Sequence, residues 1–125
     1  MTNEEAYDIY DRAFDFAVKS DKLLDKLHKS MAIMEYGKRL IKASGSIGAN
    51  IEEADGVLTR RDFINKMGIA RRESRESRHW LRLIEATASF KEQVEKEELK
   101  WLIKESTEIM LILNSIIEDT ENKNY

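Results

Sequence analysis

One feature restricts the fold of this chain more than any other: two stripes of uncharged residues that recur at helical spacing. Alternating steps of four and three residues trace one stripe through residues 33–54 and another through residues 63–88. Such heptad-type stripes place one face of each helix against a partner, whereas a β-strand would alternate every second residue. The stripes consist of Ile33, Gly37, Leu40, Ser44, Ile47, Ile51 and Ala54, and of Phe63, Met67, Ala70, Ser74, Ser77, Leu81, Ile84 and Ala88.

Small residues make up much of both stripes and of the flank of the first. A crossing lined by small side chains lets two helix axes approach closely. We therefore expect the second and third helices to pack tightly, which would offset the helix propensity lost at the glycines, about 1 kcal/mol each relative to alanine. The small residues are Gly37, Ser44, Gly45, Gly48, Ala49 and Ala54 in the first half and Ala70, Ser74 and Ser77 in the second.

Capping signals divide the chain into four predicted helices. Thr2 with Glu5 and Thr59 with Asp62 have the three-residue spacing of helix N-terminal signals, and Ser30 can cap the second helix. The expected connections between these helices are about two to six residues long, and such short connections force neighbouring helices to run antiparallel. The sequence therefore predicts a single all-α domain, an up-down-up-down four-helix bundle. Its expected helices span about 3–28, 31–54, 60–89 and 94–118.

The composition narrows the classes of function. The chain has no cysteine and no proline, and 36% of its residues are charged. Without cysteine there is no disulfide framework and no thiolate metal site, which fits a reducing cytoplasm. No apolar run approaches the roughly 20 residues of a membrane-spanning helix. We therefore expect a cytoplasmic protein of long helices that needs no membrane, metal or cofactor.

A resemblance to a known family rests on the glycine-containing segment and the helix that follows it. The residues are Ser46-Ile47-Gly48-Ala49-Asn50-Ile51-Glu52-Glu53-Ala54, Asp62-Phe63-Ile64, Glu73, Glu76 and Trp80-Leu81-Arg82-Leu83. They resemble the four helix bundle protein family, also called the 23S rRNA intervening-sequence proteins. The resemblance implies a small bacterial bundle that assembles as a ring-shaped homopentamer, and most members have no established activity. The accessory variability protein of diversity-generating retroelements, which works with a reverse transcriptase and RNA, looks similar in fold.

Positive charge is concentrated in residues 60–82. This segment holds eight basic and three acidic residues, whereas the whole chain has a net charge of −3. Five arginines, which we call the arginine face, lie on or beside one side of the predicted third helix: Arg71, Arg72, Arg75, Arg78 and Arg82. Arginines grouped in this way are typical of phosphate contacts to RNA or DNA. The alternative is salt bridging, to Glu73, Glu76 and Glu85 or to the acidic fourth helix of a neighbouring subunit.

The predicted fourth helix carries more apolar surface than one core stripe needs. Apolar residues occupy several of its sides, and residues 109–113 are apolar without interruption. A helix that is apolar almost all round needs more than one partner. We therefore predict a homo-oligomer, for which the resemblance implies a pentamer. The predicted interface consists of Trp80, Leu83, Leu102, Ile109, Leu111, Ile112 and Ile116.

Two kinds of enzyme have partial signatures in the chain. Glu76-Ser77-Arg78-His79 matches the Glu-x-x-His motif of di-iron bundles, but the helical phase does not let both ligands reach the interior. Arg72 and His79, with six residues between them, fit the permissive pattern of HEPN-type helical RNases, in which the histidine would act as general acid or base. Neither signature has further support, so the sequence favours a non-enzymatic protein with no catalytic residue.

The polar positions that the resemblance picks out have structural explanations. They are Asn50, Glu52, Glu53, Glu73 and Glu76. We expect Asn50 to hydrogen-bond across the second and third helices and fix their register, and Glu73 to pair with an arginine of another helix or subunit. The sequence as a whole predicts a homo-oligomeric assembly or nucleoprotein accessory factor. A HEPN-type RNase and a scaffold for a protein partner are the alternatives.

Overall fold

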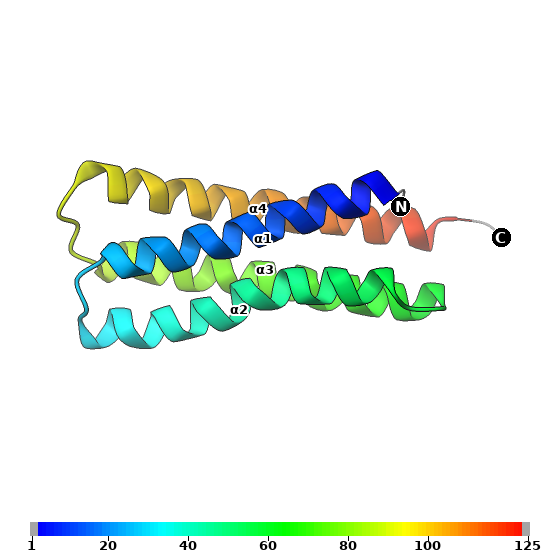
Figure 1. Cartoon of the computed structure of the whole chain (residues 1–125), viewed down its shortest axis with the longest axis horizontal. Helices are drawn as coiled ribbons and strands as arrows, with labels where there is room; N and C mark the ends of the chain where they lie inside the picture. The colour runs from blue at the N-terminus through cyan, green and yellow to red at the C-terminus, as the bar shows by residue number, and fades with distance from the viewer. Residues whose placement is uncertain (1–2, 124–125) are drawn as a thin grey trace.

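The chain forms four helices that lie side by side as an antiparallel bundle in the computed structural model (Figure 1). The structure describes residues 3–123, and the side chains of residues 8–123. The connections between the first two and the last two helices lie at one end of the bundle, and the middle connection lies at the other. The all-α up-down-up-down prediction is therefore confirmed. The helices are α1 (Asn3–Lys26), α2 (Met31–Asp55), α3 (Arg60–Thr87) and α4 (Gln93–Glu121).

Side-chain caps begin the two central helices. The Ser30 hydroxyl accepts a hydrogen bond from the Ile33 N–H at 3.1 Å, and the Thr59 hydroxyl accepts one from the Asp62 N–H at 3.1 Å. Each satisfies one of the N–H groups that a helix start leaves without an intrahelical acceptor. Both caps were expected from the sequence and are confirmed. Thr2, the predicted cap of α1, lies outside the described residues.

Three helix ends differ from the sequence prediction. α1 and α3 end about two residues early, and α4 continues about three residues further. At the end of α1, Leu27 turns into the core and the Lys29 ammonium donates to the Leu24 carbonyl at 3.0 Å. At the end of α4, Thr120 extends the buried stripe, and its hydroxyl donates to the Ile116 carbonyl at 2.8 Å. Tertiary packing therefore sets the ends of α1 and α4 more than local residue preference does.

The bundle core lies where the buried stripes of all four helices meet, and α2 and α3 form the most extensive helix contact. Their small residues Ala43, Ser44, Ala54, Ala70, Ser74 and Ser77 are all buried. The serine hydroxyls donate to carbonyls of their own helices, from Ser44 to Ile41 at 3.3 Å and from Ser74 to Ala70 at 2.9 Å. These hydroxyl groups are therefore hydrogen-bonded although they are buried. The predicted tight packing of α2 on α3 is confirmed.

The glycines of α2 do not serve that contact, which corrects the expectation. A Cβ on Gly37 would lie 3.4 Å from Leu24 of α1, and a Cβ on Gly48 would lie 3.7 Å from Tyr10 of α1. A Cβ on Gly45 would have nothing within 4 Å, because this glycine is exposed. Gly37 and Gly48 therefore leave room for the side chains of α1, and Gly45 faces outward.

The buried stripe of α4 is wider than expected. Leu102, Ile109 and Ile116, predicted at a subunit interface, lie instead in the core of the chain itself. They face inward because each lies three or four residues from another core position of α4. Trp80, Leu83 and Ile112 are half-buried, and Leu111 is 57% exposed. The predicted interface is thereby reduced to these four residues, and their contact with a second subunit stays a prediction. None of the four described helices is long and apolar enough to cross a membrane.

Replacing Gly45 by alanine should stabilise the fold. Alanine is favoured over glycine inside a helix by about 0.5–1 kcal/mol, and the new methyl group meets open space. The measurement is the free energy of unfolding in urea. Gly37→Ala is the comparison variant, because its methyl group would lie in van der Waals contact with Leu24 at 3.4 Å, so its effect includes packing against α1. A Gly45→Ala chain that is less stable than the wild type would contradict an open surface here and indicate a closely packed neighbouring chain.

Candidate nucleic-acid interface

The arginine face lies on the side of α3 that borders α4. The Arg71 Nη1 donates to the Asn114 Oδ1 at 2.7 Å, and the Arg78 Nη1 donates to the Thr107 Oγ1 at 3.2 Å. Both arginines are half-buried against α4. Their partners are neutral, so these hydrogen bonds fix the guanidinium groups without cancelling their charge.

The remaining arginines of the face point into solvent. Arg72 is exposed, and its Nη2 lies 3.7 Å from the Glu73 carboxylate. Arg75 and Arg82 are exposed as well, and within residues 8–123 neither makes an ion pair. Glu76 and Glu85, which the sequence offered as salt-bridge partners, do not pair with the face in this part of the chain. The arginine face therefore keeps most of its positive charge in the folded chain.

Three acidic residues of α4 form ion pairs with α1, on the other side of the helix. Arg12 donates to both oxygens of Glu105, at 2.6 and 3.1 Å, and to Glu108 at 2.9 Å. The hydrogen bond to Glu105 raises the pKa of Arg12, while desolvation opposes the change. Lys26 contacts Glu98 at 3.2 Å. Sequence analysis missed these pairs, because partners some 70 to 96 residues apart leave no local spacing signal.

Asn50 does not bridge α2 and α3 as predicted. Its Nδ2 donates to the Ser46 carbonyl at 2.8 Å, one turn back along α2. The short amide side chain reaches its own backbone more easily than the neighbouring helix. The link between the two helices is instead the Lys66–Glu53 ion pair at 2.8 Å, on the bundle surface. Register therefore comes from packing and not from Asn50.

Glu73 and its neighbours complete the set of polar residues that the resemblance picked out. Glu73 is half-buried, and within the chain its ion-pair partner is Arg72 of the same helix, not an arginine of another helix; pairing with another subunit stays a prediction. Burial raises the pKa of Glu73 above its usual value, nearby Glu76 raises it further, and Arg72 opposes both. Glu52 and Glu76 are exposed. These residues make no cluster that suggests catalysis.

The enzyme signatures remain isolated side chains. Arg72 contacts Glu73, and the His79 ring packs edge-on against Trp80 with their centroids 4.9 Å apart. Neither contact joins Arg72 to His79. Glu76 and His79 are both exposed, so the Glu-x-x-His motif does not point into the bundle. Among the described residues there is no group of three or more acidic, histidine or cysteine residues that could hold a metal ion.

Comparison with known proteins agrees with this geometry. The sequence model of the 23S rRNA-intervening sequence protein family matches residues 5–115. The chain belongs to this family. A crystal structure of a protein with unknown function from the S23 ribosomal protein family of Bacteroides thetaiotaomicron is similar, with 34% identity and a TM-score of 0.77. The similarity covers 91% of this chain and 98% of the other. No curated protein matches the chain.

The raised pKa of Glu73 predicts a pH-dependent contribution to stability. The folded chain holds the Glu73 proton more tightly than the unfolded chain does. The stability that the protonated Glu73 contributes is therefore fully present below the usual carboxyl pKa. It is lost as the pH rises through the pKa of Glu73 in the folded chain. The free energy of unfolding of Glu73→Gln, relative to that of the wild type, should therefore increase as the pH is raised from about 3 to about 7. Unfolding in urea at both pH values is the measurement.

Glu52→Gln serves as the control for this measurement. Glu52 is exposed on α2, so the same substitution there removes no buried carboxyl, and the pH-dependent gain of Glu73→Gln should exceed any change at Glu52. A pH-independent effect of Glu73→Gln would contradict the assigned desolvation.

Proposed function

We propose that this chain is a homo-oligomeric accessory protein that binds single-stranded nucleic acid through the arginine face of α3. The observation that carries the proposal is the charge that this face keeps. Arg75 and Arg82 lie exposed, and the half-buried Arg71 and Arg78 bond to a neutral amide and a neutral hydroxyl. Guanidinium groups held in this way suit phosphate oxygens, with which they form paired hydrogen bonds.

The placement of the acidic residues supports this proposal over internal salt bridging. The carboxylates of α4 that form ion pairs do so with α1, at Glu98, Glu105 and Glu108. The side of α4 toward the arginine face instead offers Thr107 and Asn114. The carboxylate on this side of α4 is that of Glu118, which accepts a hydrogen bond from the Asn114 amide at 3.2 Å, and among the described residues it makes no ion pair with the arginine face.

The overall net charge of −3 limits the strength of such binding. The repulsion acts at long range, and salt screens charges separated by more than about 10 Å at 0.1 M ionic strength. Contacts within the arginine face act at shorter range. We therefore propose weak, strongly salt-dependent binding, to which the avidity of several copies in one oligomer would add. The family description names 23S rRNA, which makes RNA the first nucleic acid to test.

Exposed apolar side chains support the oligomeric part of the proposal. Leu111 is 57% exposed on α4, and Ile112 beside it lines a groove with Asp8 and Asp119. Such a groove presents apolar surface that a second subunit would bury. The family resemblance implies a pentamer, so the arginine face would occur several times on one particle. An acidic surface of a neighbouring subunit is the competing occupant of the arginine face.

Removing two exposed arginines should weaken RNA binding in a salt-dependent way. The variant is Arg75→Gln with Arg82→Gln, and the ligand is a short labelled single-stranded RNA followed by fluorescence anisotropy. Each lost phosphate contact lowers the slope of log K against log salt by about 0.7, so the double variant should lose about 1.4. Its mass in solution, measured in parallel, should match that of the wild type.

The matched control removes the same charge from α2. Lys38→Gln with Lys42→Gln changes two exposed cations on another helix and should leave the salt slope unchanged. Equal slopes for wild type and the arginine variant would exclude phosphate contacts by the arginine face. Loss of the oligomer in the arginine variant would instead assign the face to a contact between subunits.

A further inference from the structure

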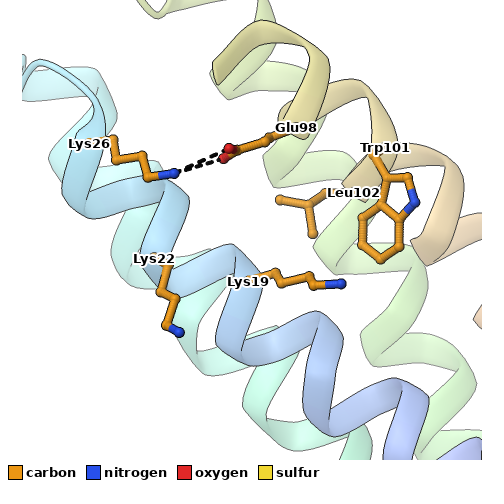
Figure 2. Close-up of a pocket in the computed structure, with 6 residues that line it drawn as sticks. All are labelled: Lys19, Lys22, Lys26, Glu98, Trp101 and Leu102. Atoms are coloured by element: carbon orange, nitrogen blue, oxygen red, sulfur yellow. Dashed lines mark hydrogen bonds and ion pairs between the residues drawn. The ribbon is translucent and has the colours of Figure 1, made fainter. Parts of the chain in front are cut away.

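A pocket of about 290 Å³ between α1 and α4 combines cations with an aromatic ring. We call it the Trp101 pocket. Lys19, Lys22 and Lys26 line it from α1, and Glu98, Trp101 and Leu102 line it from α4. Figure 2 shows Lys26 extending to Glu98 and Lys19 extending toward the Trp101 ring. Sequence analysis did not identify this group, although the three lysines recur at helical spacing along α1.

The pocket carries excess positive charge. Lys26 is paired with Glu98, and Lys19 contacts Asp15 at 2.9 Å on its own helix. Lys22 is exposed, and among the described residues it has no ion-pair partner. Of the three ammonium groups that line the pocket, two have a carboxylate partner, so Lys22 supplies its excess positive charge. Strongly hydrated ammonium groups on flexible side chains are suited to phosphate groups as point charges.

Trp101 gives the pocket a surface for an aromatic ligand. The indole is 43% exposed, although the neighbouring Leu102 is buried in the core. The Lys19 ammonium lies over the ring, 4.4 Å from its centroid. A cation at that position shows that one ring face is accessible from the pocket. A planar base that stacks there would replace the ammonium, which would remain beside the phosphate of the same nucleotide.

Basic residues connect this pocket to the arginine face. Lys96, Lys100 and Lys104 are exposed and recur every four residues along α4. The contacts of Arg78 with Thr107 and of Lys19 with Trp101 fix the antiparallel register of α3 and α1 on α4. In this register Arg82 and Lys19 lie within about one helical turn of Lys100 along the bundle, and Lys22 and Lys26 lie further toward the start of α4. A band of basic residues, with the exposed Glu97 of α4 among them, therefore crosses from α3 over α4 to α1.

We propose that single-stranded nucleic acid bound on the arginine face continues across α4 into the Trp101 pocket, where one base stacks on Trp101 and the adjoining phosphate contacts Lys22. This inference rests on the proposed function and adds a second, base-dependent contact to it. Stacking on an aromatic side chain is tolerant of sequence, because every base has a π face. The band thus combines a phosphate track with one stacking platform, as single-stranded nucleic-acid grooves do.

Comparing a normal with an abasic oligonucleotide tests the stacking contact. The two probes are a labelled oligothymidylate and an abasic oligodeoxynucleotide of the same length, which carry the same phosphates. Stacking of one base strengthens binding by about 5-fold to 160-fold, so the wild-type chain should prefer oligothymidylate by that factor. Trp101→Ala should reduce the preference toward one and leave the salt slope unchanged, because no charge is removed. Trp101→Phe keeps a smaller ring and should retain part of the preference.

Two further variants separate this inference from the proposed function. Phe14→Ala removes an aromatic ring of similar exposure from α1, outside the residues that line the pocket, and should behave like the wild type. Arg75→Gln with Arg82→Gln should weaken both probes equally and keep the preference. If the wild type binds both probes equally and only the arginine variant is weakened, the Trp101 pocket is excluded while the arginine face stands. If the wild type binds neither probe nor RNA, both proposals fail.

Discussion

Close packing of α2 on α3 is the contact on which the rest of this bundle depends. It is the most extensive helix contact in the chain, and the small buried residues of both helices let them approach each other. Serine at these positions carries no unsatisfied hydroxyl, since Ser74 and Ser77 donate to carbonyls of α3 itself. Once this pair is fixed, the core face of α3 points to the bundle axis, and the side of α3 that borders α4 is fixed as well. The arginine face lies on that side, with Arg71 and Arg78 against α4 and the other three arginines exposed.

The rotation of α4 explains why the arginines keep their charge. α4 buries a wide stripe in the core and turns its paired carboxylates toward α1, where Arg12 bonds to Glu105 and Glu108. The side of α4 that meets α3 offers Asn114 and Thr107. An overall acidic chain thereby presents a local basic surface. Glu105 is buried and accepts two hydrogen bonds from Arg12, so this arrangement matters for the packing of α1 on α4 as well as for what the surface of α3 can bind.

The sequence alone was sufficient to predict the fold, because stripe spacing and capping residues are local signals. Ser30 and Thr59 marked two helix starts, and uncharged stripes marked the core faces. Contacts between residues far apart in the sequence could not be predicted from it. Asn50 was expected to bridge helices but bonds to Ser46, and Leu102 was expected at an interface but lies in the core.

The arginine face was likewise predicted only in part from the sequence. Helical spacing placed its five residues together, but only the structure shows that Arg71 and Arg78 bond to neutral partners. The Trp101 pocket joins residues of α1 and α4 that are about 80 positions apart in the sequence. No spacing rule connects such residues, because their proximity results from the antiparallel packing of the two helices.

The most direct test of the account is the mass of the protein in solution by light scattering, with and without a short single-stranded RNA, at low and at moderate salt. We predict the mass of several chains, near five, that increases by bound RNA at low salt and returns to the protein mass at moderate salt. Such a result would join an oligomer to an electrostatic nucleic-acid contact. A single-chain mass that RNA leaves unchanged at either salt concentration would contradict both parts of the account.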